Sequence, residues 1–277
     1  MQSREISPAR QAVLDKIKEK ERAGLFNEPV EVDPPATVLL PKAVDYLCEK
    51  PSSKIKRWMA NLIADRCFSR LIKKGALIVD GVTGLENLSA LQDGAVLTCN
   101  HFSPFDNYVL FHCIRKHLPK KYLYKVIREG NYTGFRGLYG FFFRHCNTLP
   151  LSSNRRTMIN FTKAVNTLLK NGETVLIYPE QEMWWNYKKP RPLKTGAFKI
   201  AKKAGVPVVP AFITMQDDGR LDENGYPLQR HTVHILPAVY PDGVTAEEML
   251  EKTYQAWKEK YEEVYGLPLV YEREDKA

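Results

Sequence analysis

The chain has 277 residues, of which 44% are hydrophobic and 26% charged, as in an ordinary soluble globular protein. It contains no run of 18 apolar residues, which excludes a helix that spans a bilayer, and residues 1–5 lack the apolar core of a signal peptide. The formal net charge of +9 indicates an anionic partner: nucleic acid, anionic lipid or a phosphorylated substrate. Its five cysteines are odd in number and lack the paired spacing of metal ligands, so we expect reduced thiols in a cytoplasmic protein and no metal site.

The first part of the chain predicts two helices joined by a proline-rich extended segment. Residues 8–23 are typical of a charged surface helix, and apolar residues recur at helical spacing over residues 54–74. The second helix carries a basic face, which allows two interpretations. It lies in the headgroup layer of an anionic membrane, or it packs on the protein's own core with a solvated basic back. The membrane-binding candidates are Trp58, Met59, Leu62, Lys56 and Arg57.

After Gly75 the pattern changes to alternating strands and helices. Short apolar runs predict strands at residues 76–79, 95–99, 122–127, 174–178, 206–213 and 232–239. Helical patterns begin at Pro104 and after Arg155, and cover residues 194–204 and 246–265. The alternation predicts an α/β fold with a mixed, largely parallel sheet flanked by helices. We expect residues 1–75 to form an N-terminal helical segment for membrane association and residues 76–277 to form the α/β domain.

A histidine and an aspartate flank the junction of a predicted strand and helix. His101 follows the strand, Ser103 and Pro104 suit the first positions of a helix, and Asp106 falls in its first turn. Along an ideal helix their side chains would point about 140° apart, and a turn at Ser103 and Pro104 could bring them together. The pair then forms a general base with its orienting carboxylate, which activates a hydroxyl. Alternatively, Asp106 only caps the helix and His101 is a loop residue.

Glu180 stands at the carboxyl end of another predicted strand, which Pro179 ends. In parallel sheets the active crevice lies at this end of the strands, so we expect Glu180 near His101. A cationic run follows that could hold a phosphate or a phosphorylated thiol carrier, or could be an ordinary basic loop. Its members are Lys188, Lys189, Arg191 and Lys194. Nearby tryptophans could stack on nucleobases, but no nucleic-acid-binding signature accompanies them, so we expect no nucleic-acid partner.

Several sequence blocks occur in a recognisable order between residues 81 and 211. They are Gly-x-Glu-Asn-Leu at residues 84–88, His-x-x-x-x-Asp at 101–106, the segment 149–156 that ends in Asn-Arg-Arg, Tyr-Pro-Glu at 178–180, and Val-Val-Pro at 208–210. Together they resemble the phospholipid/glycerol acyltransferase family, typified by 1-acylglycerol-3-phosphate acyltransferases. The resemblance covers about half of the chain and implies the fold of glycerolphosphate acyltransferases.

The resemblance also implies a mechanism. His101, oriented by Asp106, would act as general base on a lipid hydroxyl, which attacks the thioester of acyl-CoA or acyl-carrier protein without an acyl-enzyme. Glu180 would help to build the active-site loop. No cofactor is implied beyond the donor substrate. Ser103 as an acylated nucleophile is the rival chemistry, but no glycine-flanked nucleophile elbow surrounds it.

Two blocks depart from the family pattern. Ser152 and Ser153 stand where the family commonly has an arginine that grips the acceptor's phosphate, which Arg155 or Arg156 could replace. Glu182 stands in the third block and would repel a dianion if it were unpaired. These departures weaken the inference that the acceptor bears a phosphate monoester. The family resemblance alone makes 1-acylglycerol-3-phosphate the leading acceptor, and the alternatives are another lysophospholipid, a glycolipid or an amino-lipid alcohol.

The site of action follows from the same resemblance. We expect a peripheral enzyme at the cytoplasmic face of the membrane, with the lipid surface and the acyl-CoA or acyl-carrier protein as its partners. A non-catalytic lipid- or nucleic-acid-binding module is the alternative from another class.

Overall fold

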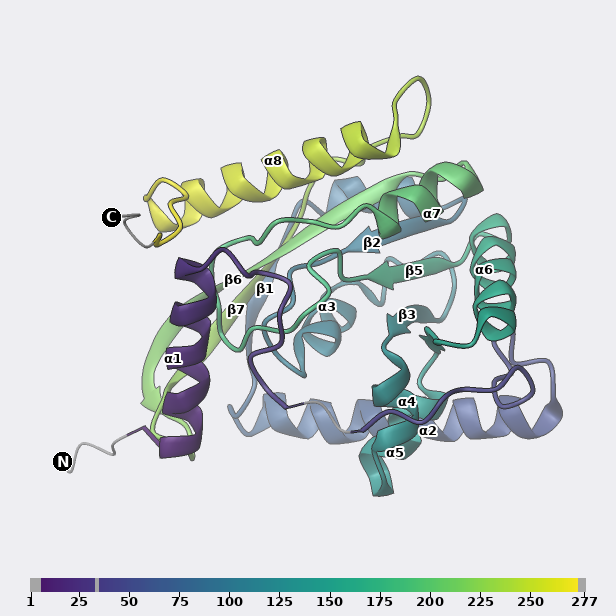
Figure 1. Cartoon of the computed structure of the whole chain (residues 1–277), viewed down its shortest axis with the longest axis horizontal. Helices are drawn as coiled ribbons and strands as arrows, with labels where there is room; N and C mark the ends of the chain where they lie inside the picture. The colour runs from purple at the N-terminus through teal and green to yellow at the C-terminus, as the bar shows by residue number, and fades with distance from the viewer. Residues whose placement is uncertain (1–5, 33–34, 274–277) are drawn as a thin grey trace.

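The structure is a computed structural model that describes residues 6–32 and 35–273. Its centre is a seven-stranded sheet in the order β1-β7-β6-β2-β5-β3-β4 (Figure 1). The strands are β1 (Ile78–Thr83), β2 (Ala95–Thr98), β3 (Leu123–Ile127), β4 (Thr148–Pro150), β5 (Thr174–Ile177), β6 (Val208–Leu221) and β7 (Pro227–Ile235). Neighbouring strands are parallel except β6 and β7, which form an antiparallel hairpin. The predicted fold class, a mixed and largely parallel sheet flanked by helices, is confirmed.

Helices cover both faces of the sheet (Figure 1). They are α1 (Pro8–Arg22), α2 (Pro51–Lys73), α3 (Asp106–Ile114), α4 (Glu129–Gly134), α5 (Gly137–His145), α6 (Arg155–Lys170), α7 (Gly196–Ala204) and α8 (Ala246–Tyr265), with a 3-10 helix η1 (Leu85–Leu91). Successive strand residues point to opposite faces, so Val96 of β2 joins the core beneath α6, α7 and α8, whereas Leu97 joins the core beneath α3 and η1. The all-buried β2 and β5 thus form the middle of a sandwich of helices.

The fold requires glycine at position 84, in the first sequence block, for a steric reason. Gly84 adopts φ +73°, and a Cβ there would lie 1.9 Å from the backbone oxygen of Ile235. The side chain of Asn87, in the same block, donates to that oxygen over 2.9 Å. The block therefore fixes η1 against the end of β7, which allows the chain to enter β2 at the centre of the sheet.

The β6–β7 hairpin is longer than predicted. β6 continues to Leu221, beyond the predicted end at residue 213, and its second half is mostly exposed. Strand β7 begins at Pro227 instead of residue 232 and ends at Ile235, while Val239 makes only an isolated bridge to Val208. The residues after 215 are mostly polar, yet backbone pairing with β7 stabilises a strand there without an apolar side-chain pattern.

Residues of the N-terminal part pack on the α/β core. Ile17, Phe26 and Val30 form a hydrophobic cluster with Trp184. Farther along, α2 packs against α5 through Ala60 and Ala64, and it runs along the side of the molecule opposite α8 (Figure 1). The division into residues 1–75 and 76–277 stays a prediction. In the part of the chain that the structure describes, no helix is long and apolar enough to cross a membrane.

Candidate active site

The structure brings His101 and Asp106 together. His101 Nδ1 lies 2.7 Å from Asp106 Oδ2, which also accepts the backbone N–H groups of Phe102 at 3.1 Å and Ser103 at 3.3 Å. These bonds hold the tight turn between β2 and α3 on which the pairing of His101 with Asp106 depends. Asp106 is fully buried, whereas the imidazole is 22% exposed. Because the carboxylate accepts the proton on Nδ1, the lone pair is on Nε2, which has no hydrogen-bond partner among the described residues.

The predicted helix cap is wrong in detail. Helix α3 begins at Asp106, so Phe105 occupies the capping position and makes no side-chain cap bond. Ser103 Oγ instead accepts the backbone N–H of Phe105 at 3.2 Å, inside the turn. No hydrogen bond joins Ser103 Oγ to His101 in the described part of the chain, so this geometry does not activate the serine as a nucleophile.

Tyr178 completes the pair and was not predicted as a functional residue. Its hydroxyl donates to Asp106 Oδ1 over 2.6 Å, and its ring stacks on the imidazole with centroids 4.0 Å apart. Burial, followed by the charge of Asp106, raises the pKa of Tyr178 well above its ordinary value, so the hydroxyl remains a donor. The register of the parallel strands β2 and β5, which pairs Thr98 with Ile177, places Tyr178 beside the segment that carries His101.

Glu180 fixes the backbone of the histidine. Its Oε2 accepts the backbone N–H of His101 at 2.9 Å, and its Oε1 accepts that of Arg191 at 2.8 Å. Both Glu180 and Arg191 are almost completely buried, at 2% and 1% exposure, and their side chains pair at 2.9 Å. Glu180 thus lies at the site, as expected, and connects the turn after β2 with the loop after β5.

Arg191 requires a correction. We expected its guanidinium to contact a substrate phosphate, but protein oxygens enclose it. It donates to the backbone oxygens of Phe26 at 3.2 Å, of His101 at 3.4 Å and of Glu182, besides its bond to Glu180. A buried carboxylate needs such a partner to stay charged. We therefore assign Arg191 to a structural ion pair.

The remaining predicted cations do not form one cluster. Lys189 pairs with Glu21 of α1 at 2.6 Å, and Lys188 lies 3.4 Å from Asp217 of β6. Lys194 is exposed. Arg155 and Arg156 are exposed at the start of α6, where Asn154 caps the helix by accepting two backbone N–H groups. Their contact with substrate stays a prediction.

The two departures from the family pattern have partners in the structure. Glu129 accepts from Ser152 Oγ at 2.6 Å and from Ser153 Oγ at 2.9 Å, at the place where the family's arginine was expected. Burial raises the pKa of Glu129, but these and backbone hydrogen bonds outweigh it and lower the pKa, which keeps the group ionised. Glu182 accepts both Nη atoms of Arg128, at 2.9 and 3.1 Å, so the sequence-based premise of an unpaired acid is wrong.

Comparisons with known proteins show that part of the chain is similar to acyltransferases. A family model described as Acyltransferase matches residues 81–214. A 1-acyl-sn-glycerol-3-phosphate acyltransferase of Chlamydomonas reinhardtii is 30% identical over 178 residues, which are 63% of this chain and 51% of that protein. A chloroplastic 1-acyl-sn-glycerol-3-phosphate acyltransferase of Brassica napus is 33% identical over 149 residues, 52% of this chain and 39% of that protein. The chain thus matches about half or less of the length of these curated relatives.

The crystal structure of PlsC, a 1-acyl-sn-glycerophosphate acyltransferase from Thermotoga maritima, shares the fold. The two structures superpose with a TM-score of 0.56 over 95% of this chain and 99% of that one, at 19% sequence identity. The match of the Acyltransferase family model to residues 81–214 confirms the resemblance that the sequence blocks carry.

Proposed function

We propose that this protein is an O-acyltransferase that moves a fatty acyl group from a thioester donor to the hydroxyl of a lipid. The observation that carries the proposal is the pairing of His101 with Asp106, because it leaves Nε2 of a partly exposed imidazole available as a base. The names of the related proteins support the same reaction class.

The reaction follows from the geometry. Nε2 of His101 takes the proton of the acceptor hydroxyl while the oxygen attacks the thioester carbonyl. The tetrahedral intermediate collapses, the carbon–sulfur bond breaks, and the departing thiolate takes the proton from the imidazolium. Asp106 stabilises the imidazolium between these steps, and Tyr178 and two backbone N–H groups hold Asp106. Acyl-CoA and acyl-carrier protein both supply this thioester, and the direct transfer calls for no further cofactor.

The leading acceptor is 1-acylglycerol-3-phosphate, which the names of the relatives support. A second candidate has a specific observation in its favour. Glu129 places a carboxylate beside Ser152 and Ser153, where a phosphate-binding arginine was expected, and like charges repel. This favours an acceptor without a phosphate monoester: another lysophospholipid, a glycolipid or an amino-lipid alcohol.

Peripheral attachment to the cytoplasmic face of a membrane is part of the proposal. Trp58 and Met59 of α2 are 55% and 41% exposed, and Lys56 beside them is exposed. Leu138 and Tyr139 of the adjoining helix α5 are also exposed. Leu62 and Arg57, the other two predicted membrane residues, are half-buried. An apolar surface flanked by cations suits the headgroup layer of an anionic bilayer.

The first experiment measures transfer of labelled palmitate from palmitoyl-CoA and from palmitoyl-acyl-carrier protein to a panel of acceptors. His101→Ala should lower the rate by roughly 10²- to 10⁴-fold, the usual contribution of a general base. His117→Ala is the matched control, because His117 is exposed after α3 and should leave the rate unchanged. Transfer that survives in His101→Ala would contradict the mechanism, and the preferred acceptor decides between the two candidates.

A further inference from the structure

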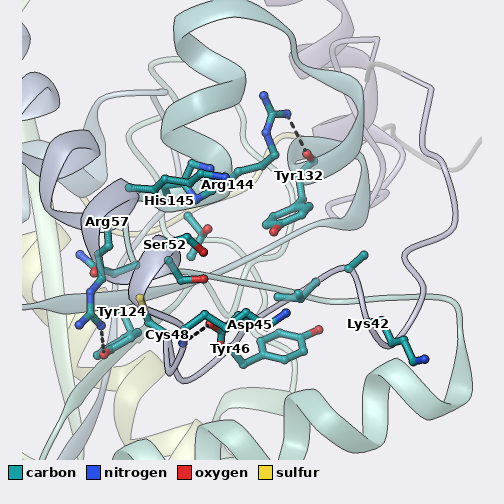
Figure 2. A pocket seen from close by; sticks show the side chains of 17 residues that line it. Lys42, Asp45, Tyr46, Cys48, Ser52, Arg57, Tyr124, Tyr132, Arg144 and His145 are labelled. Atoms are coloured by element: carbon teal, nitrogen blue, oxygen red, sulfur yellow. Dashed lines mark hydrogen bonds between the residues drawn. The ribbon is translucent and has the colours of Figure 1, made fainter.

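A cationic cavity lies away from the catalytic pair. It has a volume of about 250 Å³ and is enclosed by residues 42–53, the first turns of α2, the start of β3, and the chain that leads from α5 into β4 (Figure 2). Strand β4 is the outer edge of the sheet, whereas His101 follows the central strand β2. None of the residues that hold the catalytic pair lines this cavity, so it is a separate feature of the surface.

Positive charge dominates the lining. Its five cations are Lys42, Lys50, Lys56, Arg57 and Arg144. The lining holds one carboxylate, Asp45, whose oxygens accept the backbone N–H groups of Glu49 and Lys50 at 3.0 Å each. Within residues 6–32 and 35–273, none of the five cations forms an ion pair. The lining thus has four more positive than negative charges, with Glu173 outside it acting on Arg57, and an anion in this space would reduce the repulsion among the cations.

The two arginines are fixed in place. Arg57 Nη1 donates to Tyr124 Oη at 3.1 Å, and Arg144 Nη1 donates to the backbone oxygen of Phe135 at 3.1 Å. Figure 2 shows Arg57 and Tyr124 at one side of the cavity and Arg144 and His145 above it. The buried Nε of Arg57 has no hydrogen-bond partner in the described part of the chain, so one strong donor at this cavity is unused.

The amino end of helix α2 adds to the positive charge around the cavity. It begins at Pro51 with no side-chain cap, and Ser52 and Ser53 of its first turn line the cavity. The amino end of a helix of 23 residues carries partial positive charge and unpaired N–H groups, which favour anions. Burial lowers the pKa of His145, and the positive charges of Lys56 and Arg144 lower it further.

We propose that this cavity binds the phosphate group of a phosphorylated ligand. Lysine and arginine side chains with an uncapped helix end are the groups that recognise phosphate oxygens. Its volume is below the range of typical ligand pockets, which suits a phosphate with a small head group better than a nucleotide. The ligand has two sources, a lipid head group at the bilayer or a free phosphate ester. The exposed Ile55 and Trp58 on the same helix place the first source within reach of the cavity.

The test compares two double variants with equal loss of charge. Lys42→Gln with Lys50→Gln removes two exposed cations of the cavity that are not among the membrane-binding candidates, and Lys54→Gln with Arg66→Gln removes two exposed cations of α2 outside the cavity. Each is made in the His101→Ala protein and tested without donor, so that turnover plays no part. The probes are inorganic phosphate and glycerol 3-phosphate by calorimetry, and phosphatidylcholine vesicles with and without phosphatidylglycerol by sedimentation.

The cavity variant should bind at least one class of probe roughly tenfold more weakly than the control variant, since two charge-assisted contacts are lost. Loss confined to the soluble probes identifies a free phosphate ester, and loss confined to the anionic vesicles identifies a lipid head group. In the parent protein, the bound probe should also raise the pKa of His145, followed by NMR. Equal binding by the two double variants, or no binding of any probe, would overturn the proposal.

Discussion

Removal of the Tyr178 hydroxyl isolates the support of the proposed catalytic base. In Tyr178→Phe the ring can still stack on His101, but Oδ1 of the fully buried Asp106 loses its 2.6 Å donor. A hydrogen bond to a charged group contributes about 1.5–3 kcal/mol, so a carboxylate that has lost this support should hold the imidazole less well. If that energy acts on the transition state, kcat should fall roughly ten- to a hundredfold. KM for the acceptor should change little, because the hydroxyl is engaged with Asp106.

The assay measures kcat and KM for acyl transfer, with urea unfolding of the same samples. Tyr265→Phe is the matched control, because its hydroxyl bonds to the backbone of Met215 at 2.8 and 3.1 Å in another part of the fold. Both variants should lose stability, but only Tyr178→Phe should lose kcat. Because the pKa of Tyr178 lies well above its ordinary value, the pH–rate profile of the wild type should show no change from ionisation of this group up to pH 10. A kcat within twofold of wild type would refute the reasoning.

Three further changes test the supports of the site and the fold. Glu180→Gln leaves the buried guanidinium of Arg191 without its counter-charge and should cost about 3–5 kcal/mol of unfolding free energy in urea, whereas a loss below 1 kcal/mol would show that the pair is dispensable. Burial lowers the pKa of His234 to about 4, so the contribution of this group to the free energy of unfolding should fall by up to roughly 3 kcal/mol as the pH drops from about 6.5 to 4, and stay level below pH 4. If His234→Gln shows the same pH dependence, other groups are responsible for it. Phe26→Ala removes a ring that stacks on the buried Trp184 at 5.7 Å and should cost about 3–5 kcal/mol and lower kcat, while an unchanged kcat would limit this segment to a stabilising role.

The sequence predicted the two groups of the proposed catalytic pair, because both lie in one short segment. The strand, the turn-forming Ser103 and Pro104, and the spacing of His101 and Asp106 are all local features. Their contact depended on a turn that local rules allowed but did not require. The backbone N–H groups of Phe102 and Ser103 stabilise this turn, because they donate to the same Asp106 oxygen that pairs with the imidazole.

The partners from distant segments could not be predicted in this way. Tyr178 lies beside Asp106 because of the register in which the parallel strands β2 and β5 pair. The apolar pattern of a strand does not show with which residues it pairs. Arg191 stands in a run of cations that suggested a surface loop. Its burial depends on Glu180 and on the backbone oxygen of Phe26, which belongs to the N-terminal segment. The polar second half of β6 was missed for a similar reason, since its strand structure comes from pairing with β7.

The distribution of exposure at the site bears on substrate recognition. Asp106, Glu180 and Arg191 are at most 2% exposed, whereas the imidazole of His101 is 22% exposed. Burial of charged groups costs desolvation free energy, but a buried network of ion pairs and hydrogen bonds also fixes the geometry around a reacting group. The network therefore presents mainly the base itself to a substrate, and its own charges are occupied.

Recognition of the acceptor must then rest on groups outside this network. The ends of β3 and β4 are candidates, because they lie at the same edge of the parallel sheet as the turn that carries His101. There Arg128 pairs with Glu182, and Glu129 bonds to Ser152 and Ser153. An incoming phosphate would have to compete with Glu182 for Arg128, whereas a neutral or cationic head group would meet two carboxylates already held in place. Selectivity among acceptors should thus respond to changes at these ends more than to changes in the cationic run after residue 187.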